Sequence, residues 1–139
     1  MKPTLGTDSL LLAPIAAANS ERTANLDCAG ANYATIRVEL GAELNTNSTN
    51  VAVALLESND TTASNFATFT STYQRTVDNT AATIATFHVD LEGRKRYLRI
   101  KVTPDTTTNG PVTSAVSATL YKNLITDSAT MLGPDVIVG

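Results

Sequence analysis

The segment EGRKRYLRIKV concentrates the positive charge of this chain between residues 92 and 102. It supplies half of the ten Lys and Arg residues in the sequence: Arg94, Lys95, Arg96, Arg99 and Lys101. Guanidinium and ammonium groups bind phosphate and carboxylate oxygens, so one interpretation is a surface that docks on phosphate or on an acidic partner. The other is a strand whose charges face water or protect a sheet edge. We favour the strand or a protein partner over nucleic acid, because few aromatic residues accompany the basic ones.

The other reactive side chains stand alone. Cys28 is the only cysteine and His88 the only histidine, which excludes an intrachain disulfide and a metal site with several Cys or His ligands. We expect Cys28 to be a small buried residue and His88 an ordinary strand residue. No phosphate-binding loop, dinucleotide fingerprint or HExxH motif is present. The sequence predicts no catalytic, metal-binding or cofactor-binding residue and no enzyme, although a carboxylate pair assembled from distant strands stays open.

A short apolar run closes the sequence. Val136, Ile137 and Val138 follow Pro134 and have no obvious place in the strand pattern before them. Two interpretations are equally open: the run folds back onto its own core, or it adds as a strand to a neighbouring subunit. With the five basic residues, these three form the candidate partner interface.

Composition favours β-structure and argues against two kinds of partner. The 139 residues fit one domain, and 23 of them are Thr, whose branched side chain suits strands. A formal net charge of −3 lacks the broad basic footprint that nucleic-acid binding needs. No apolar run approaches the ~18 residues of a membrane span, so we expect neither nucleic acid nor a membrane as partner.

The apolar stretch SLLLAPIAAANS, residues 9–20, has two interpretations. It has the apolar core and small final residues of a signal peptide. However, Lys2 is the only positively charged side chain before it, Asp8 abuts it, and Pro14 interrupts it. Proline is tolerated in edge strands, so we favour an edge strand over residues 9–18.

Alternation of apolar and polar residues predicts the other strands. ATIRVEL, residues 34–40, places its four apolar side chains on one side and Thr, Arg and Glu on the other. RYLRIKVT, residues 96–103, likewise directs Leu98, Ile100 and Val102 inward, and the basic Arg99 and Lys101 outward. Further strands are predicted at 51–58, near 66–77, at 83–90 and at 112–121, with a turn at Gly93 and a long connection over 19–32.

About eight short strands with no convincing helix predict an all-β, single-domain antiparallel β-sandwich, jelly-roll-like or Ig-like. The predicted organisation has extended terminal arms. It consists of an N-terminal arm at 1–8, the sandwich at 9–121 and a C-terminal extension at 122–139.

The order of these motifs resembles a family of small β-sandwich virion proteins of tailed bacteriophages. Residues 9–42, SLLLAPIAAANSERTANLDCAGANYATIRVELGA, resemble the family's opening strand and its segment of tyrosine, alternating strand and Gly-Ala. VALLESNDTTASNFATF, 53–69, resembles its strand that ends in an ESDDG-like turn, although the turn glycine is missing here. GRKRYLRIKVTPDTTTNGPVTSAVSATL, 93–120, resembles its GxRYLR-type strand, loop and final Val/Ala strand. The loop at 45–50 and the tail after Leu120 do not match.

The resemblance implies a capsid decoration or cement protein that binds the exterior of the head and stabilises neighbouring capsid subunits. The expected partners are the major capsid protein and further copies of this chain, as a homodimer or homotrimer. The expected location is the capsid surface of the virion, after synthesis in the host cytoplasm. The alternatives are a phage tail or head–tail connector subunit and a carbohydrate-binding β-sandwich module.

Overall fold

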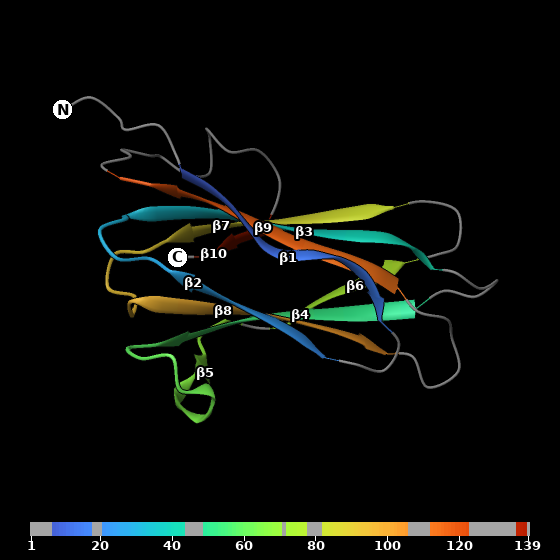
Figure 1. Cartoon of the computed structure of the whole chain (residues 1–139), viewed down its shortest axis with the longest axis horizontal. Helices are drawn as coiled ribbons and strands as arrows, with labels where there is room; N and C mark the ends of the chain where they lie inside the picture. Colours follow the sequence, from blue (N-terminus) through green and yellow to red (C-terminus); the bar gives the residue numbers. More distant parts are fainter. Residues whose placement is uncertain are drawn as a thin grey trace.

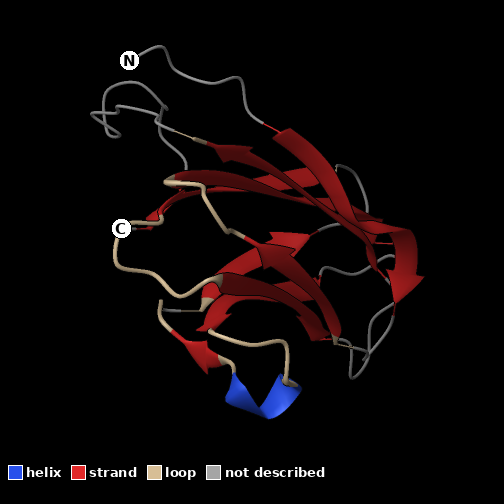
Figure 2. Cartoon of the chain, turned by 60° about the vertical axis from the view of Figure 1, so that its left-hand side comes forward, coloured by secondary structure: helices blue, strands red, loops and turns tan. Residues whose placement is uncertain are grey.

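A computed structural model of the chain describes residues 7–17, 21–43, 49–70, 72–77, 82–105, 112–122 and 136–138. These residues form two β-sheets packed face to face (Figures 1 and 2). The all-β sandwich predicted from the sequence is confirmed.

The first sheet, sheet A, has the strand order β1-β9-β3-β7-β10. Its pairings are antiparallel except that β10 runs parallel to β7. Its strands are β1 (Thr7–Ala17), β3 (Tyr33–Glu43), β7 (Thr83–Asp90), β9 (Val112–Tyr121) and β10 (Val136–Val138).

The second sheet, sheet B, has the order β2-β8-β4, and both β5 and β6 pair with the far edge of β4. Its strands are β2 (Arg22–Asp27), β4 (Thr49–Ser58), β5 (Ala67–Thr68), β6 (Tyr73–Val77) and β8 (Tyr97–Asp105). A single 3-10 turn, Ala63–Asn65, is the only helical element of the described residues.

Eight of the strands follow the order of a jelly roll. The sheet β1-β9-β3-β7 faces β2-β8-β4-β6, and the chain crosses between the sheets at most of its connections. The first strand therefore pairs with β9 and the second with β8. Of the two sandwich types left open by the sequence, this order is that of the jelly roll, to which β5 and β10 are additions.

The core lies between the sheets and is made by the alternating residues of each strand. Ile36 and Phe87 from sheet A, and Leu98 and Ile100 from sheet B, are at most 1% exposed. Removing this apolar surface from water is the main stabilising contribution. Arg99 and Lys101 lie on the opposite side of β8 from the core, as the alternation predicts.

Several predicted boundaries need correction. Residues 19–32 were expected to be one long connection, yet they contain β2, whose Ala24 and Leu26 point into the core. The first strand spans Thr7–Ala17 instead of 9–18, so it includes two residues assigned to the N-terminal arm. The expected strand at 66–69 shrinks to Ala67–Thr68.

Candidate interaction surface

Arg99 of the basic segment is held on the outer face of sheet B by contacts within the chain. Its Nε donates to Oδ1 of Asn25 at 2.8 Å, and its Nη1 donates to the carbonyl oxygen of Ala63 at 3.4 Å. Its guanidinium carbon lies 4.0 Å from the centroid of the Phe66 ring, a cation–π geometry. The guanidinium thus joins β8 to β2 and to the 3-10 turn.

Arg96 and Lys101 have carboxylate partners. Arg96 forms a bidentate pair with Asp27, with Nε to Oδ1 at 2.9 Å and Nη2 to Oδ2 at 2.8 Å. These hydrogen bonds lower the pKa of Asp27 to about 2 and raise the pKa of Arg96. Lys101 Nζ lies 2.9 Å from a carboxylate oxygen of Glu21.

The turn between β7 and β8 carries the other two basic residues. Arg94 lies 3.8 Å from Glu57 and stacks over the ring of Phe69 at 4.6 Å. The Lys95 backbone N–H donates to the same carboxylate at 3.2 Å, while the Lys95 side chain is exposed and has no ion pair in the described part of the chain. Gly93 shapes the turn at φ +77°, as predicted. Chain-internal acidic groups therefore neutralise most of the predicted basic surface.

The C-terminal residues Val136–Val138 pair with the chain's own β7, as the strand β10 at the edge of sheet A. The basic row of Arg99 and Lys101 lies on the outer face of the other sheet. The two predicted interface segments therefore lie in different sheets, and the turn that carries Arg94 follows β7 directly.

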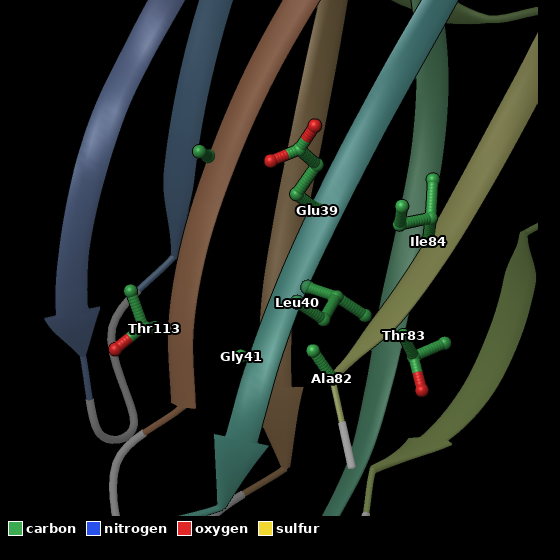
Figure 3. A pocket seen from close by; sticks show the side chains of 8 residues that line it. Glu39, Leu40, Gly41, Ala82, Thr83, Ile84 and Thr113 are labelled. Atoms are coloured by element: carbon green, nitrogen blue, oxygen red, sulfur yellow. The ribbon is translucent and has the colours of Figure 1, made fainter.

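A different surface, which sequence reasoning did not single out, lies on the outer face of sheet A. A hollow of about 230 Å³ lies there, between β9, β3 and β7. Figure 3 shows the side chains that line it. Ile84 stands beside it and is 45% exposed. The residues that line the hollow are mostly small or apolar: Glu39, Leu40, Gly41, Ala82, Thr83, Ile84, Thr113 and Ala115.

Gly41 keeps this hollow open. A Cβ atom at position 41 would lie only 3.1 Å from Cβ of Thr113, so a larger residue would displace its neighbour.

The sequence did contain a signal for the surface. In TIATFHVD the inward positions are Ala85 and Phe87, which leaves Ile84 as an outward apolar residue on a strand.

A second, more polar hollow of about 340 Å³ lies on the same face, near β1. Leu10, which is 67% exposed, contributes to its lining. Thr119 donates a hydrogen bond to Asp8 at one side, and Arg37 lies 3.4 Å from Glu39 nearby. The two exposed large apolar side chains of the described residues, Leu10 and Ile84, thus both belong to the outer face of sheet A.

His88 is a strand residue, as predicted, but its environment is unusual. It is 5% exposed, and neither ring nitrogen has a hydrogen-bond partner among the described residues. The buried hydroxyl of Tyr33, on the adjacent strand β3, also has none there. Burial raises the pKa of Tyr33 the most, followed by the charge of Asp90 and then by Tyr121. A buried polar group without a partner costs about 1–3 kcal/mol, so each of these two side chains lowers the stability of sheet A.

The described residues show no assembled reaction centre. They contain no group of three or more His, Cys, Asp or Glu side chains placed to hold a metal ion. Cys28 is buried as predicted, and its burial raises the pKa of the thiol to about 12. No helix in the described segments is long and apolar enough to cross a membrane.

All seven aromatic side chains are described, and none is an exposed platform. Tyr33 and Phe87 are buried, and the other five are half-buried. Arginine guanidinium groups stack on Phe66, Phe69, Tyr73 and Tyr97, and Tyr121 packs against Tyr33 at 6.2 Å between ring centroids.

No protein-family model and no curated protein matches the sequence. Among solved structures, the chain is similar to dimeric latent PorU from Porphyromonas gingivalis, with 11% identity and a TM-score of 0.44, over 91% of this chain and 14% of that one. It is also similar to an exo-β-1,3-galactanase from Phanerochaete chrysosporium, with 9% identity and a TM-score of 0.41, over 83% and 29%. The chain spans less than a third of either neighbour, and these comparisons assign it to no family.

Proposed function

We propose that this chain is a virion structural protein of a tailed bacteriophage, of the capsid decoration type. It binds the exterior of the head through sheet A and stabilises neighbouring capsid subunits, and it is not an enzyme. The ordered sequence motifs over residues 9–121 support the family. Eight-stranded jelly rolls also occur in viral capsid domains, so the fold is compatible by analogy with this proposal.

The proposed binding mode is based on the apolar hollow beside Ile84. An exposed isoleucine next to an apolar hollow offers a partner protein both a side chain to cover and a space to fill. Central apolar anchors of this kind supply most of the free energy of protein–protein binding. The basic segment is less suited to this role, because Arg94, Arg96 and Lys101 already have carboxylate partners.

Many copies on one capsid make a modest contact sufficient. If each sandwich contacts two neighbouring capsid subunits, the second contact forms at high effective concentration, which raises overall affinity by about 10²–10⁴. The major capsid protein is therefore the partner that we propose, at the capsid surface of the virion.

The carbohydrate-binding alternative has less geometric support. Sugar rings bind to exposed aromatic faces. Here an arginine guanidinium stacks on four of the seven aromatic rings, and two others pack against each other, so these faces are already covered. A tail or connector subunit shares the fold and differs from a decoration protein in stoichiometry, since it forms rings.

The test is co-sedimentation with expanded capsids of the encoding phage, stripped of this protein. Wild-type protein should bind saturably with a fixed number of copies per capsid subunit. Ile84→Asp places a charge at the apolar hollow and should weaken binding at least about tenfold, which is about 1.4 kcal/mol. Gln74→Asp, on an exposed position of β6 in sheet B, is the matched control and should bind as wild type does.

Absence of saturable wild-type binding would overturn the decoration function, and binding to purified tails or to glycan surfaces would then identify an alternative. Equal loss of binding in the Ile84→Asp and Gln74→Asp variants would overturn the assignment of the surface to sheet A.

A further inference from the structure

Two arginines of sheet B reach across to backbone carbonyl groups of sheet A, one at each side of the sandwich. Arg22 of β2 donates to the carbonyl oxygen of Ala13, on the edge strand β1, at 2.8 Å. Arg75 of β6 donates from Nη2 to the carbonyl oxygen of Ile84, on β7, at 3.3 Å. Ile84 is the residue whose exposed side chain stands beside the apolar hollow (Figure 3), so the contact made by Arg75 reaches the proposed capsid-binding surface directly.

The part of β7 that carries Ile84 has less support than a strand inside a sheet. β3 pairs with one side of β7 over its whole length, whereas β10 pairs with the other side only at residues 87–89. Among the described residues, no strand lies beside residues 83–86 on that second side. Backbone groups at a free sheet edge have no ladder partner, and such segments open more readily than the centre of a sheet. Arg75 therefore gives the Ile84 carbonyl a donor that no described strand offers.

The guanidinium of Arg75 is itself held in place by a chain of contacts that begins in the core. Its Nη1 donates to the hydroxyl of Tyr73 at 2.7 Å, and its central carbon lies 5.8 Å from the centroid of the same ring. Tyr73 meets the Phe87 ring edge-on, with 5.6 Å between the ring centroids. Phe87 is buried between the sheets. The position of the core is thus transmitted through Tyr73 and Arg75 to the backbone of Ile84.

We propose that Arg75 is a positioning residue of the contact surface on sheet A: by holding the Ile84 carbonyl from the other sheet, it fixes the Ile84 side chain beside the hollow. The carbonyl carbon and Cβ are bonded to the same Cα atom, so restraining one restricts the direction of the other. This inference rests on the proposed capsid-binding function and adds to it a residue that acts through Ile84. A side chain that is already fixed loses less conformational freedom on association. Loss of the guanidinium should therefore weaken binding about threefold to tenfold.

The test compares Arg75→Met with Arg22→Met, the matched loss of a guanidinium that joins the two sheets at the other side. NMR relaxation of the isoleucine δ1 methyl groups measures the order of the Ile84 side chain without any capsid, with the buried Ile100 as internal reference. We expect the order parameter of Ile84 to fall in Arg75→Met and to equal that of wild type in Arg22→Met, with Ile100 unchanged in both. Co-sedimentation with stripped capsids should then show the loss of affinity for Arg75→Met alone.

Tyr73→Phe covers the case in which Arg75→Met impairs folding, because it removes only the hydroxyl that accepts from Arg75 and keeps the ring against Phe87. A smaller fall in the order of Ile84 is expected. An order parameter equal to that of wild type in both variants, or an equal fall in Arg22→Met, refutes the positioning role. A fall in order with unchanged capsid affinity refutes it as well. Wild-type protein that does not bind capsids contradicts the proposed function instead, and the methyl measurement separates the two failures because it involves no capsid.

Discussion

The arginines of the basic segment show how side-chain partners decide the meaning of a charged sequence. Arg96 meets Asp27 and Arg99 meets Asn25 across 69 and 74 residues of sequence, respectively. No local pattern reports such partners, so the sequence left a docking surface and a solvated strand as competing interpretations. The alternation of the strand did predict the outward direction of Arg99 and Lys101. Which charges are already neutralised depends on the pairing of β2 with β8, which only the fold reveals.

The pair of Asp27 and Arg96 predicts a specific dependence of stability on pH. Hydrogen bonds from Arg96 and from the Ala29 backbone lower the pKa of Asp27 from 3.8 to about 2. Because the pKa is lower in the folded state, the stabilisation is complete above the unfolded-state pKa and is lost as pH falls through the folded-state pKa. The stability difference between wild type and Asp27→Asn should therefore shrink between about pH 4 and about pH 2. Both side chains are about half exposed, so solvent screening keeps the difference small.

Urea unfolding of the two proteins across this pH range measures the effect. An NMR titration of the Asp27 carboxyl group checks its cause directly. A titration midpoint near 4 in the folded protein would contradict the hydrogen-bonded pair.

At the scale of elements, the strands that sequence could identify are those with several apolar residues in alternation. The strands at 83–90 and 112–121 have the predicted boundaries, and β4 is a central strand as its apolar character indicated. β2 was missed because it is short and directs only Ala24 and Leu26 into the core, too few for a clear period. The hollow on sheet A was missed because it depends on three strands that meet, with Gly41 facing Thr113 from the neighbouring strand.

The link between β8 and the segment after β4 predicts a measurable coupling. The guanidinium of Arg99 lies 4.0 Å from the ring centroid of Phe66. A double-mutant cycle with Arg99→Met and Phe66→Leu removes the charge and the aromatic ring while retaining most of the apolar volume. We expect a coupling free energy of about 0.5–1 kcal/mol, as for cation–π pairs near the surface.

Urea denaturation of the two single variants and the double variant gives this coupling. Arg37→Met in place of Arg99→Met is the control, because Arg37 lies on the outer face of the other sheet. Its effect should add to that of Phe66→Leu within about 0.3–0.5 kcal/mol. A coupling that is equally small for Arg99 would show that the stacked guanidinium contributes no stability.

At the scale of the whole molecule, the jelly-roll order makes distant parts of the chain depend on one another. Asp8 on the first strand is level with Thr119 on β9, and Arg22 on β2 donates to the Ala13 carbonyl at 2.8 Å and to Ser114 Oγ at 3.0 Å. The sequence predicted two antiparallel layers but not this order, since pairing partners lie up to about 110 residues apart. One core between the layers also means that neither sheet has a buried face without the other.

This dependence predicts a single cooperative unfolding transition. Leu98, on sheet B, is fully buried and belongs to the core cluster shared with Ile36 and Phe87 of sheet A. Leu98→Ala should therefore lower the free energy of unfolding by about 2–5 kcal/mol, through lost burial and a residual cavity. Reaction of the buried Cys28 thiol with a thiol reagent reports on the end of β2. Near-ultraviolet dichroism, measured in a Tyr73→Phe and Tyr97→Phe background, reports on Tyr33 and Tyr121 of sheet A. Both probes should shift to the same lower midpoint, because loss of packing in one layer exposes the other. Thr23→Ala, on an exposed position of β2, should leave the free energy of unfolding reported by each probe within about 0.5 kcal/mol of wild type. Separate transitions for the two probes would mean that the sheets unfold independently and that the shared core does not bind them into one unit.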